Sequence, residues 1–313
     1  MPNWNQVLQE VHNAQAQGRY ALDTIRRHYL QKLNKHTNRN IIAYYSGWLS
    51  KPTVAQTDIN DEDKNGFMMA VHRLDRTKGL DLILHTPGGN IAATQSIVQY
   101  LQEMFANDIR AIVPQIAMSA GTMIACSCKE ILMGKQSNLG PIDPHIRNIP
   151  TFGVIEEFQR AIREIKADPT TLPVWQQIIG QYRPTFLGQC EKAIKWSGEF
   201  VENQLSTVMF AGEARAKSKA KKAVRALSDY TKNLSHDRHI PANECEKLGL
   251  KIFYIEQDQK LQDLILTVHH CYMHVFMNTN AFKIIENHLG AALVKQQALV
   301  QHPALAPAGA VPE

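Results

Sequence analysis

The apolar positions between residues 40 and 134 follow two alternating rhythms. Short runs of β-branched and aromatic residues, typical of buried strands, alternate with stretches in which apolar residues recur every three to four positions, typical of helices. The strands are expected at 41–49, 80–85, 109–114 and 130–134, and the helices at 67–74, 92–105 and 119–128. Strands that alternate with helices in this way form right-handed βαβ crossovers and a parallel sheet. The pattern therefore predicts an α/β fold of repeated βα units.

The flanking regions are predicted to be mostly helical. Residues 4–33 carry apolar side chains near a 3.6-residue period, which indicates an amphipathic helix or a helical pair. After a Gly/Pro-rich loop, the expected elements are helices at 154–166, 171–182, 185–208 and 213–234, a strand at 251–256 and a helix at 259–277. We expect an N-terminal helical segment (1–38), one domain with a largely helical C-terminal part (39–290) and a disordered tail (291–313) that ends in a Pro/Ala-rich stretch.

The composition narrows the range of functions. With 313 residues, of which 44% are hydrophobic and 20% charged, the chain can bury a large core. Its five cysteines lack CxxC or finger-like spacing and the N-terminus has no leader pattern, so we expect a cytoplasmic protein. No window approaches the ~18 apolar residues of a membrane-spanning helix. The basic run at 215–225 has no interleaved aromatic residues and lies in a predicted amphipathic helix. We therefore expect no integral membrane segment and no nucleic-acid partner.

Two glycine-containing turns carry the most informative chemistry. The segments HTPGGN (85–90) and AMSAGT (117–122) each follow an apolar strand and each open a helix. Gly88 and Gly89 allow positive φ, so that their amides can face a cavity. Ser119 lies at a strand-to-helix junction, where free amides and the helix dipole favour negative charge. An oxyanion could receive hydrogen bonds from the amides of Gly88 and Ala120, each worth ~3–4 kcal/mol in acyl transfer. The pair of turns predicts a serine hydrolase.

The order of these segments resembles a known group of enzymes. Strand, TPGG, helix, strand, MSAGT, helix, strand and SNLGPIDP (137–144) follow one another as in the Clp/crotonase-fold serine peptidases, which include ClpP and signal peptide peptidase A. Within this group the chain resembles the serine dehydrogenase proteinase family, and the likeness continues into 174–187, the HDRHI segment near 236 and 261–270. The resemblance implies a Clp/crotonase-like fold and a homo-oligomer. It also implies endopeptidase activity on protein or peptide substrates through an acyl-enzyme on Ser119. We expect no metal and no cofactor.

The base that would activate Ser119 has three candidates. ClpP-like enzymes place a histidine in the loop that corresponds to SNLGPIDPH, which implies either Asp143 or His145. Signal peptide peptidase A uses a lysine from a later helix, for which Lys166 is the nearest counterpart. We rank His145 first, because an imidazole titrates near working pH and Asp143 could orient it. Asp143 ranks second as the base itself and Lys166 third.

Two other functions remain open on the sequence alone. A crotonase-like acyl-CoA enzyme would use the same pair of backbone amides to stabilise an enolate without a nucleophilic serine. A non-catalytic oligomeric scaffold would keep the fold and not the chemistry. His270 and His274 have the i, i+4 spacing of two metal ligands on one helix face. A zinc site needs at least a third ligand and no HExxH pattern is present, so we interpret them as hydrogen-bonded interior or interface histidines.

Overall fold

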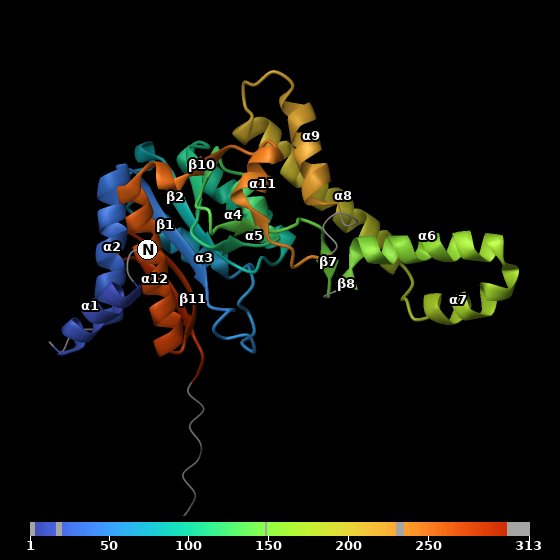
Figure 1. Ribbon diagram of the computed structural model, residues 1–313, viewed down its shortest axis with the longest axis horizontal. Coiled ribbons are helices and arrows are strands. Elements are labelled where there is room, and N and C mark those ends of the chain that lie inside the picture. The colour runs from blue at the N-terminus through green and yellow to red at the C-terminus, as the bar shows by residue number, and fades with distance from the viewer. Residues whose placement is uncertain (1–3, 17–20, 148, 230–234, 299–313) are drawn as a thin grey trace, which may run out of the picture.

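A central sheet of seven strands organises the molecule (Figure 1). The computed structural model describes residues 4–16, 21–147, 149–229 and 235–298. The strands of this sheet lie in the order β10-β5-β3-β2-β1-β11-β12. Their bounds are Asn40–Ser46 for β1, Leu80–His85 for β2, Ile109–Val113 for β3, Glu130–Met133 for β5, Ile252–Tyr254 for β10, Ala281–Asn287 for β11 and Ala292–Gln296 for β12. The first five strands of this order pair in parallel, which confirms the α/β fold predicted from the βα rhythm.

Helices cover both faces of the sheet because neighbouring strand residues point to opposite sides. Ile41 and Tyr45 of β1 pack in one buried cluster, whereas Ile42 and Tyr44 pack in the other. The first cluster lies under α1 (Trp4–Ala16), α2 (Ala21–Thr37) and α12 (Gln259–Asn278). The second lies under α3 (Asp63–Val71), α4 (Ile91–Phe105), α5 (Ala120–Cys126), α8 (Phe186–Gln204), α9 (Ala216–Leu227) and α11 (Ala242–Lys247). None of the helices in the described ranges is long and apolar enough to cross a bilayer.

The antiparallel pair β11 and β12 corrects the expectation from sequence. No strand was expected after residue 277, and residues 291–313 were expected to be a disordered tail. Instead β11 pairs with β1 and β12 pairs with β11. The sequence does not indicate this strand because β11 contains two charged residues, Lys283 and Glu286. Both are buried and paired. Lys283 Nζ lies 2.9 Å from Asp63 Oδ1, and Glu286 contacts Arg26.

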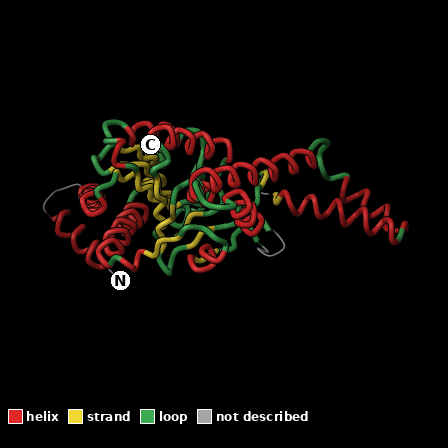
Figure 2. The backbone as a smooth tube through the Cα atoms, turned by 90° about the horizontal axis from the view of Figure 1, so that it is seen from above, coloured by secondary structure: helices red, strands yellow, loops and turns green. Residues whose placement is uncertain are grey.

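A helical arm projects from the body of the molecule (Figures 1 and 2). It begins at a two-stranded ribbon of β7 (His145–Ile146) and β8 (Ile149–Pro150). From there α6 (Thr151–Ala167) runs outward, and a 3-10 turn (Pro169–Thr171) leads into α7 (Leu172–Ile179) and back towards α8. The arm exposes several large apolar side chains, namely Ile162, Leu172 and Val174.

The predicted helices match the structure apart from their ends. The helix expected at 185–208 is α8 followed by a π-helical turn (Leu205–Met209), and the strand expected at 251–256 is β10 followed by a 3-10 turn (Ile255–Gln257). The helix expected at 213–234 is α9 up to Leu227, while residues 230–234 lie outside the described residues. The Pro/Ala-rich end of the tail, at 302–313, also lies outside them.

Candidate active site

A small sheet brings three distant segments to one place. Its strands are β4 (Ile116–Ala117), β6 (Asn138–Leu139) and β9 (Ile240–Pro241), in the order β4-β6-β9. Because β4 and β6 are parallel, the residues that follow Ala117 and those that follow Leu139 leave the sheet at the same end. Because β9 is antiparallel to β6, the residues that precede Ile240 also lie at that end. Ser119, Asp143 and His236 occupy these three segments.

Ser119 has an unusual backbone conformation. It precedes the first residue of α5 with φ 49° and ψ −112°, outside the regions that residues with a side chain normally occupy. Such a conformation costs about 1–3 kcal/mol and persists only where the surrounding structure enforces it. Here Met118 N donates to Thr86 O at 3.0 Å and Gly121 N donates to Met118 O at 2.7 Å. These bonds hold the turn that presents the half-buried Ser119 at the start of the helix.

Gly88 lies directly opposite Ser119. Its φ is +99°, and a Cβ added there would meet Ser119 Cβ at 2.7 Å and Ala120 N at 3.0 Å. A glycine is therefore required for the two turns to approach, and its backbone lies beside the Ala120 amide. The Gly88 amide donates to Thr86 Oγ1 at 3.1 Å. The two amides named as oxyanion donors from the sequence are thus neighbours in space.

Gly89 has a structural position in the same turn. Its φ is +154°, and an added Cβ would meet Ile59 N and Ile59 O at 2.3 Å. Ile59 N donates to Gly88 O at 2.7 Å, and Asn90 N donates to Ile59 O at 2.8 Å. The loop around Ile59 therefore braces the back of the turn. Gly89 makes this close backbone approach possible.

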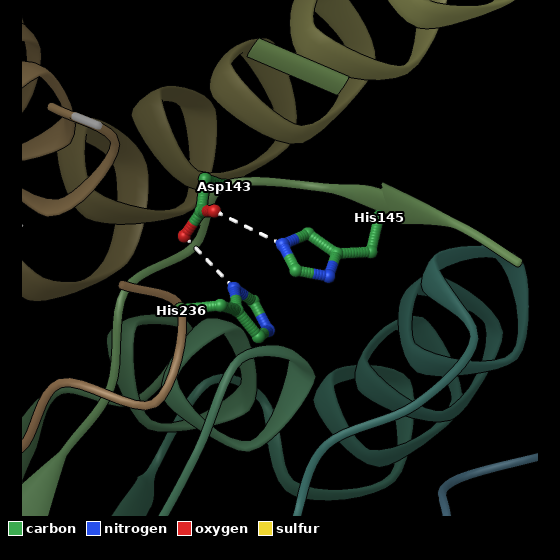
Figure 3. Close-up of side chains that lie close together, drawn as sticks. All are labelled: Asp143, His145 and His236. Carbon is green, nitrogen blue, oxygen red and sulfur yellow. Dashed lines mark hydrogen bonds and ion pairs between the residues drawn. The ribbon is translucent and has the colours of Figure 1, made fainter. Parts of the chain in front are cut away.

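Asp143 lies between two imidazoles (Figure 3). Its carboxylate is buried, with Oδ1 2.9 Å from His236 Nδ1 and Oδ2 3.3 Å from His145 Nε2. Burial alone would raise the pKa of this carboxyl. Hydrogen bonds and charge interactions with His145 and His236 outweigh the burial and hold the pKa well below its usual range. Asp143 is therefore a carboxylate at neutral pH, placed to orient an imidazole.

His236 was not named as a base from the sequence. It lies 93 residues after Asp143, in the HDRHI segment that contributed only to the family resemblance. Its Nδ1 faces Asp143, so the opposite ring nitrogen, Nε2, is directed away from the carboxylate (Figure 3). The sequence signal for His236 is that it and His239 lie just before a short apolar segment at Ile240. This signal does not indicate that His236 lies near Asp143 or Ser119.

The loop that carries Asp143 is fastened to the helix that follows Ser119. The Thr122 hydroxyl lies 3.0 Å from Ala117 O and 2.9 Å from Gly140 O, and the Gly140 amide donates to it at 3.0 Å. Ser197 Oγ of α8 donates to Ile142 O at 2.8 Å on the other side. Thr122 and Ser197 are buried, so the loop is held within the core.

Lys166 does not join this group. It lies in the last turn of α6, which belongs to the projecting arm (Figure 1). Its side chain is exposed. Within one chain the structure therefore brings Asp143, His145 and His236 together and leaves Lys166 apart.

A cavity opens beside the two turns. It has a volume of about 500 Å³, and its lining includes Pro87 and Met118, the neighbours in sequence of Gly88 and Ser119, together with His236. Trp48 and Leu49 supply an apolar wall, whereas Gln115, Gln136 and Asn138 supply polar groups. Mixed apolar and polar lining of this size is typical of ligand sites.

Two histidines of α12, His269 and His274, make contacts inside the protein. The ring nitrogen Nδ1 of His269 lies 3.4 Å from the Tyr45 hydroxyl, and His274 Nε2 lies 3.3 Å from Trp4 O. His274 also packs on the Trp4 ring, with centroids 4.0 Å apart. The burial and contacts of His274 agree with the interpretation of an interior histidine, and His269 and His274 together link α12 to β1 and α1.

An α/β sheet with a serine at a strained strand-to-helix turn, opposite a glycine turn, has the architecture of the Clp-like fold. A match to a family model then identifies the family within this fold class. Residues 11–266 match the family described as ClpP-like SDH-type serine proteinase, and the chain belongs to this family.

Two relatives are themselves uncharacterized. Uncharacterized protein MJ0137 of Methanocaldococcus jannaschii is 31% identical over 194 residues, which is 62% of this chain and 60% of that protein. Uncharacterized protein MJ1495 of the same organism is 30% identical over 194 residues, which is 62% of this chain and 59% of that protein. The chain therefore spans about 60% of the length of these relatives.

Proposed function

We propose that the protein is a serine peptidase that cleaves protein or peptide substrates through an acyl-enzyme on Ser119. The observation that supports this most strongly is the small sheet β4-β6-β9, which presents Ser119, Asp143 and His236 at one end. Membership of a serine proteinase family supports the same reaction class. The neighbouring cavity is where a substrate would lie.

His236 is the proposed general base and Asp143 its orienting group. A carboxylate that accepts a hydrogen bond from imidazole Nδ1 selects the tautomer whose Nε2 carries a lone pair. That lone pair can take the Ser119 proton during attack and return it to the leaving amine. The 2.9 Å contact from His236 Nδ1 to Asp143 supports this assignment over His145, whose contact is longer and uses Nε2.

The oxyanion is assigned to the amides of Gly88 and Ala120. Ala120 is the first residue of α5, where an amide has no partner within the helix. The Gly88 amide donates to the Thr86 hydroxyl at 3.1 Å, and a tetrahedral oxyanion would replace that hydroxyl as the acceptor. An anion is a stronger acceptor than a hydroxyl, so the exchange favours the transition state over the free enzyme.

The hydrogen bond from Ser119 to its base is expected to form only in the working enzyme. Within the described ranges, no hydrogen bond to the Ser119 hydroxyl is present. Catalytic hydrogen bonds often tighten only when substrate binds.

The exposed apolar side chains of the arm are suited to burial against a second copy of the chain, so we propose a homo-oligomer. Light scattering on the purified chain would measure its size.

A fluorophosphonate probe tests the nucleophile. Labelling is expected in the wild type and in Ser50→Ala, a control that removes an exposed hydroxyl, and is expected to vanish in Ser119→Ala. Circular dichroism would establish that all three proteins are folded. Absence of labelling on a folded, assembled wild type would contradict the acyl-enzyme. It would favour the crotonase-like chemistry or the scaffold.

A further inference from the structure

We propose that Asp143, His145 and His236 together form a binding site for Zn²⁺, and that the bound ion switches the peptidase off. One nitrogen from each imidazole and one carboxylate oxygen lie within 4.8 Å of one another. Among the described residues, no other group of three or more histidine, cysteine or acidic side chains is gathered in this way. The inhibitory part rests on the proposed function, whereas the binding of the ion does not. The expectation from sequence was that no metal binds.

The spacing of the three groups suits zinc. With bonds of 2.0–2.1 Å, two ligand atoms of a tetrahedral zinc site are separated by about 3.3 Å. In the structure the Asp143 oxygens lie 2.9 Å from His236 Nδ1 and 3.3 Å from His145 Nε2. These two distances involve different oxygens, and the three ligand atoms lie within 4.8 Å of one another, so the imidazoles must move towards an ion placed between them. Two histidines and a carboxylate are a set of ligands that zinc prefers, with a fourth position open to water.

A peptidase triad has no need of the second imidazole. Orienting His236 occupies one oxygen of Asp143, yet His145 lies against the other oxygen. His145 belongs to the ribbon at the base of the arm, whereas His236 belongs to the segment before β9. Two separate backbone elements thus direct imidazoles at one buried carboxylate, as Figure 3 shows.

Solvent can reach both imidazoles of this cluster. The side chain of Asp143 is 3% exposed, whereas those of His145 and His236 are 27% and 22% exposed. The buried carboxylate supplies negative charge, and the two half-exposed rings leave an open side. A hydrated ion can therefore reach the exposed sides of the two rings and exchange its water for the three ligands.

Zinc binding and catalysis require different tautomers of His236. In the proposed catalytic state His236 carries its proton on Nδ1 and has a free lone pair on Nε2. When zinc binds Nδ1, the proton of the neutral ring must reside on Nε2. That nitrogen can then no longer accept the Ser119 proton. Zinc also binds the Asp143 oxygen that would orient His236. One bound ion therefore prevents His236 from accepting the proton and prevents Asp143 from orienting it.

The binding test uses the Ser119→Ala protein, which separates the metal from the nucleophile. Isothermal titration with Zn²⁺ is expected to show one ion per chain, and Co²⁺ in its place is expected to give the intense visible absorption of a tetrahedral site. His145→Ala and Asp143→Asn should each weaken zinc binding by more than the 10- to 100-fold typical of residues that only support a ligand. His239→Ala, which removes an exposed imidazole of the same segment as His236, should change it less than about twofold. No binding, or binding that survives His145→Ala, overturns the site.

The inhibition test uses the intact wild type. Micromolar Zn²⁺ is expected to slow labelling of Ser119 by the fluorophosphonate, EDTA to restore it, and His145→Ala to lose the zinc sensitivity. Labelling that is unaffected by zinc in a protein that binds it overturns the switch. Labelling that requires zinc overturns it as well. A protein that binds zinc yet is never labelled keeps the metal site and refutes the proposed peptidase, so the two failures are distinguishable.

Discussion

The proposed nucleophile half of the site, around Ser119, and its proposed base half, around Asp143 and His236, are built in different ways. The Gly88 and Ser119 turns belong to consecutive βα units and meet backbone to backbone, where an added methyl at Gly88 would lie 2.7 Å from Ser119 Cβ. The base half consists of side chains from separate segments, and His236 lies 93 residues from the Asp143 that it contacts. Steric constraint therefore makes the first half rigid. The second half depends on polar contacts that a ligand or an ion can rearrange.

The largest effect after loss of Ser119 itself is expected from the base. His236→Ala should lower kcat/KM for a peptide substrate by roughly four orders of magnitude, because an unactivated serine is a weak nucleophile. His145→Ala should lower it by about tenfold or less, because that ring contacts the Asp143 oxygen that His236 does not use. Steady-state kinetics in the presence of EDTA would measure both. The reverse order would return the base to His145, as first expected from the sequence.

A second test concerns the glycine turn that faces Ser119. Gly88→Ala should lower kcat about 10²- to 10³-fold, because the new methyl lies 3.0 Å from the Ala120 amide and excludes the oxyanion. Gly89→Ala is the matched comparison, since its methyl would meet Ile59 instead of Ser119. That variant should lose about 1–3 kcal/mol of unfolding free energy. Urea unfolding and single-turnover kinetics on both proteins would separate the two roles. Equal effects on kcat and stability in the two variants would refute the distinction.

Thr122 connects the two halves, so its removal should have a moderate effect on both. Thr122→Val keeps the volume but leaves the Gly140 amide without its 3.0 Å acceptor. Leaving a buried donor unpaired costs about 1–3 kcal/mol. We expect this loss in the free energy of unfolding, measured in urea, together with slower labelling of Ser119. Unchanged stability would show that the Asp143 loop is held without this hydroxyl.

The smallest effect is expected on the arm. Lys166→Ala should leave kcat/KM within about twofold, because the side chain is exposed at the end of α6. The same kinetic assay, on protein of unchanged oligomeric size, would measure it. A loss above tenfold would place this lysine at the site of a neighbouring subunit.

Local pattern was sufficient for the first half of the site. The TPGG and MSAGT segments lie at strand ends, and strand ends of a parallel sheet share one edge, so Gly88, Ser119 and Ala120 could be placed together. The family resemblance, and not the local pattern, pointed to Asp143 and His145 in the following loop. It could not choose between them, because a shift of one or two positions in a loop changes which residue occupies the place of the base.

The paired charges of β11 mark another boundary of sequence reasoning. Lys283 and Glu286 interrupt the apolar pattern of that strand, so nothing in the local sequence indicated that it is buried. Asp63 from α3 and Arg26 from α2 neutralise the two residues inside the core. Burial of a charge depends on its partner, and the partner is set by the fold.

The sequence by itself determined the α/β architecture and indicated the proposed nucleophile turn and the amides opposite it, since periodicity and glycine conformations are properties of contiguous residues. Only the tertiary structure decided that His236 meets Asp143 and that Lys166 stays apart. The pairing of β6 with β9 brings His236 towards Asp143, because it joins segments that have no local relation in the chain. The β7–β8 ribbon adds His145 to the same carboxylate, and the three side chains form the cluster for which we propose both proton transfer and metal binding.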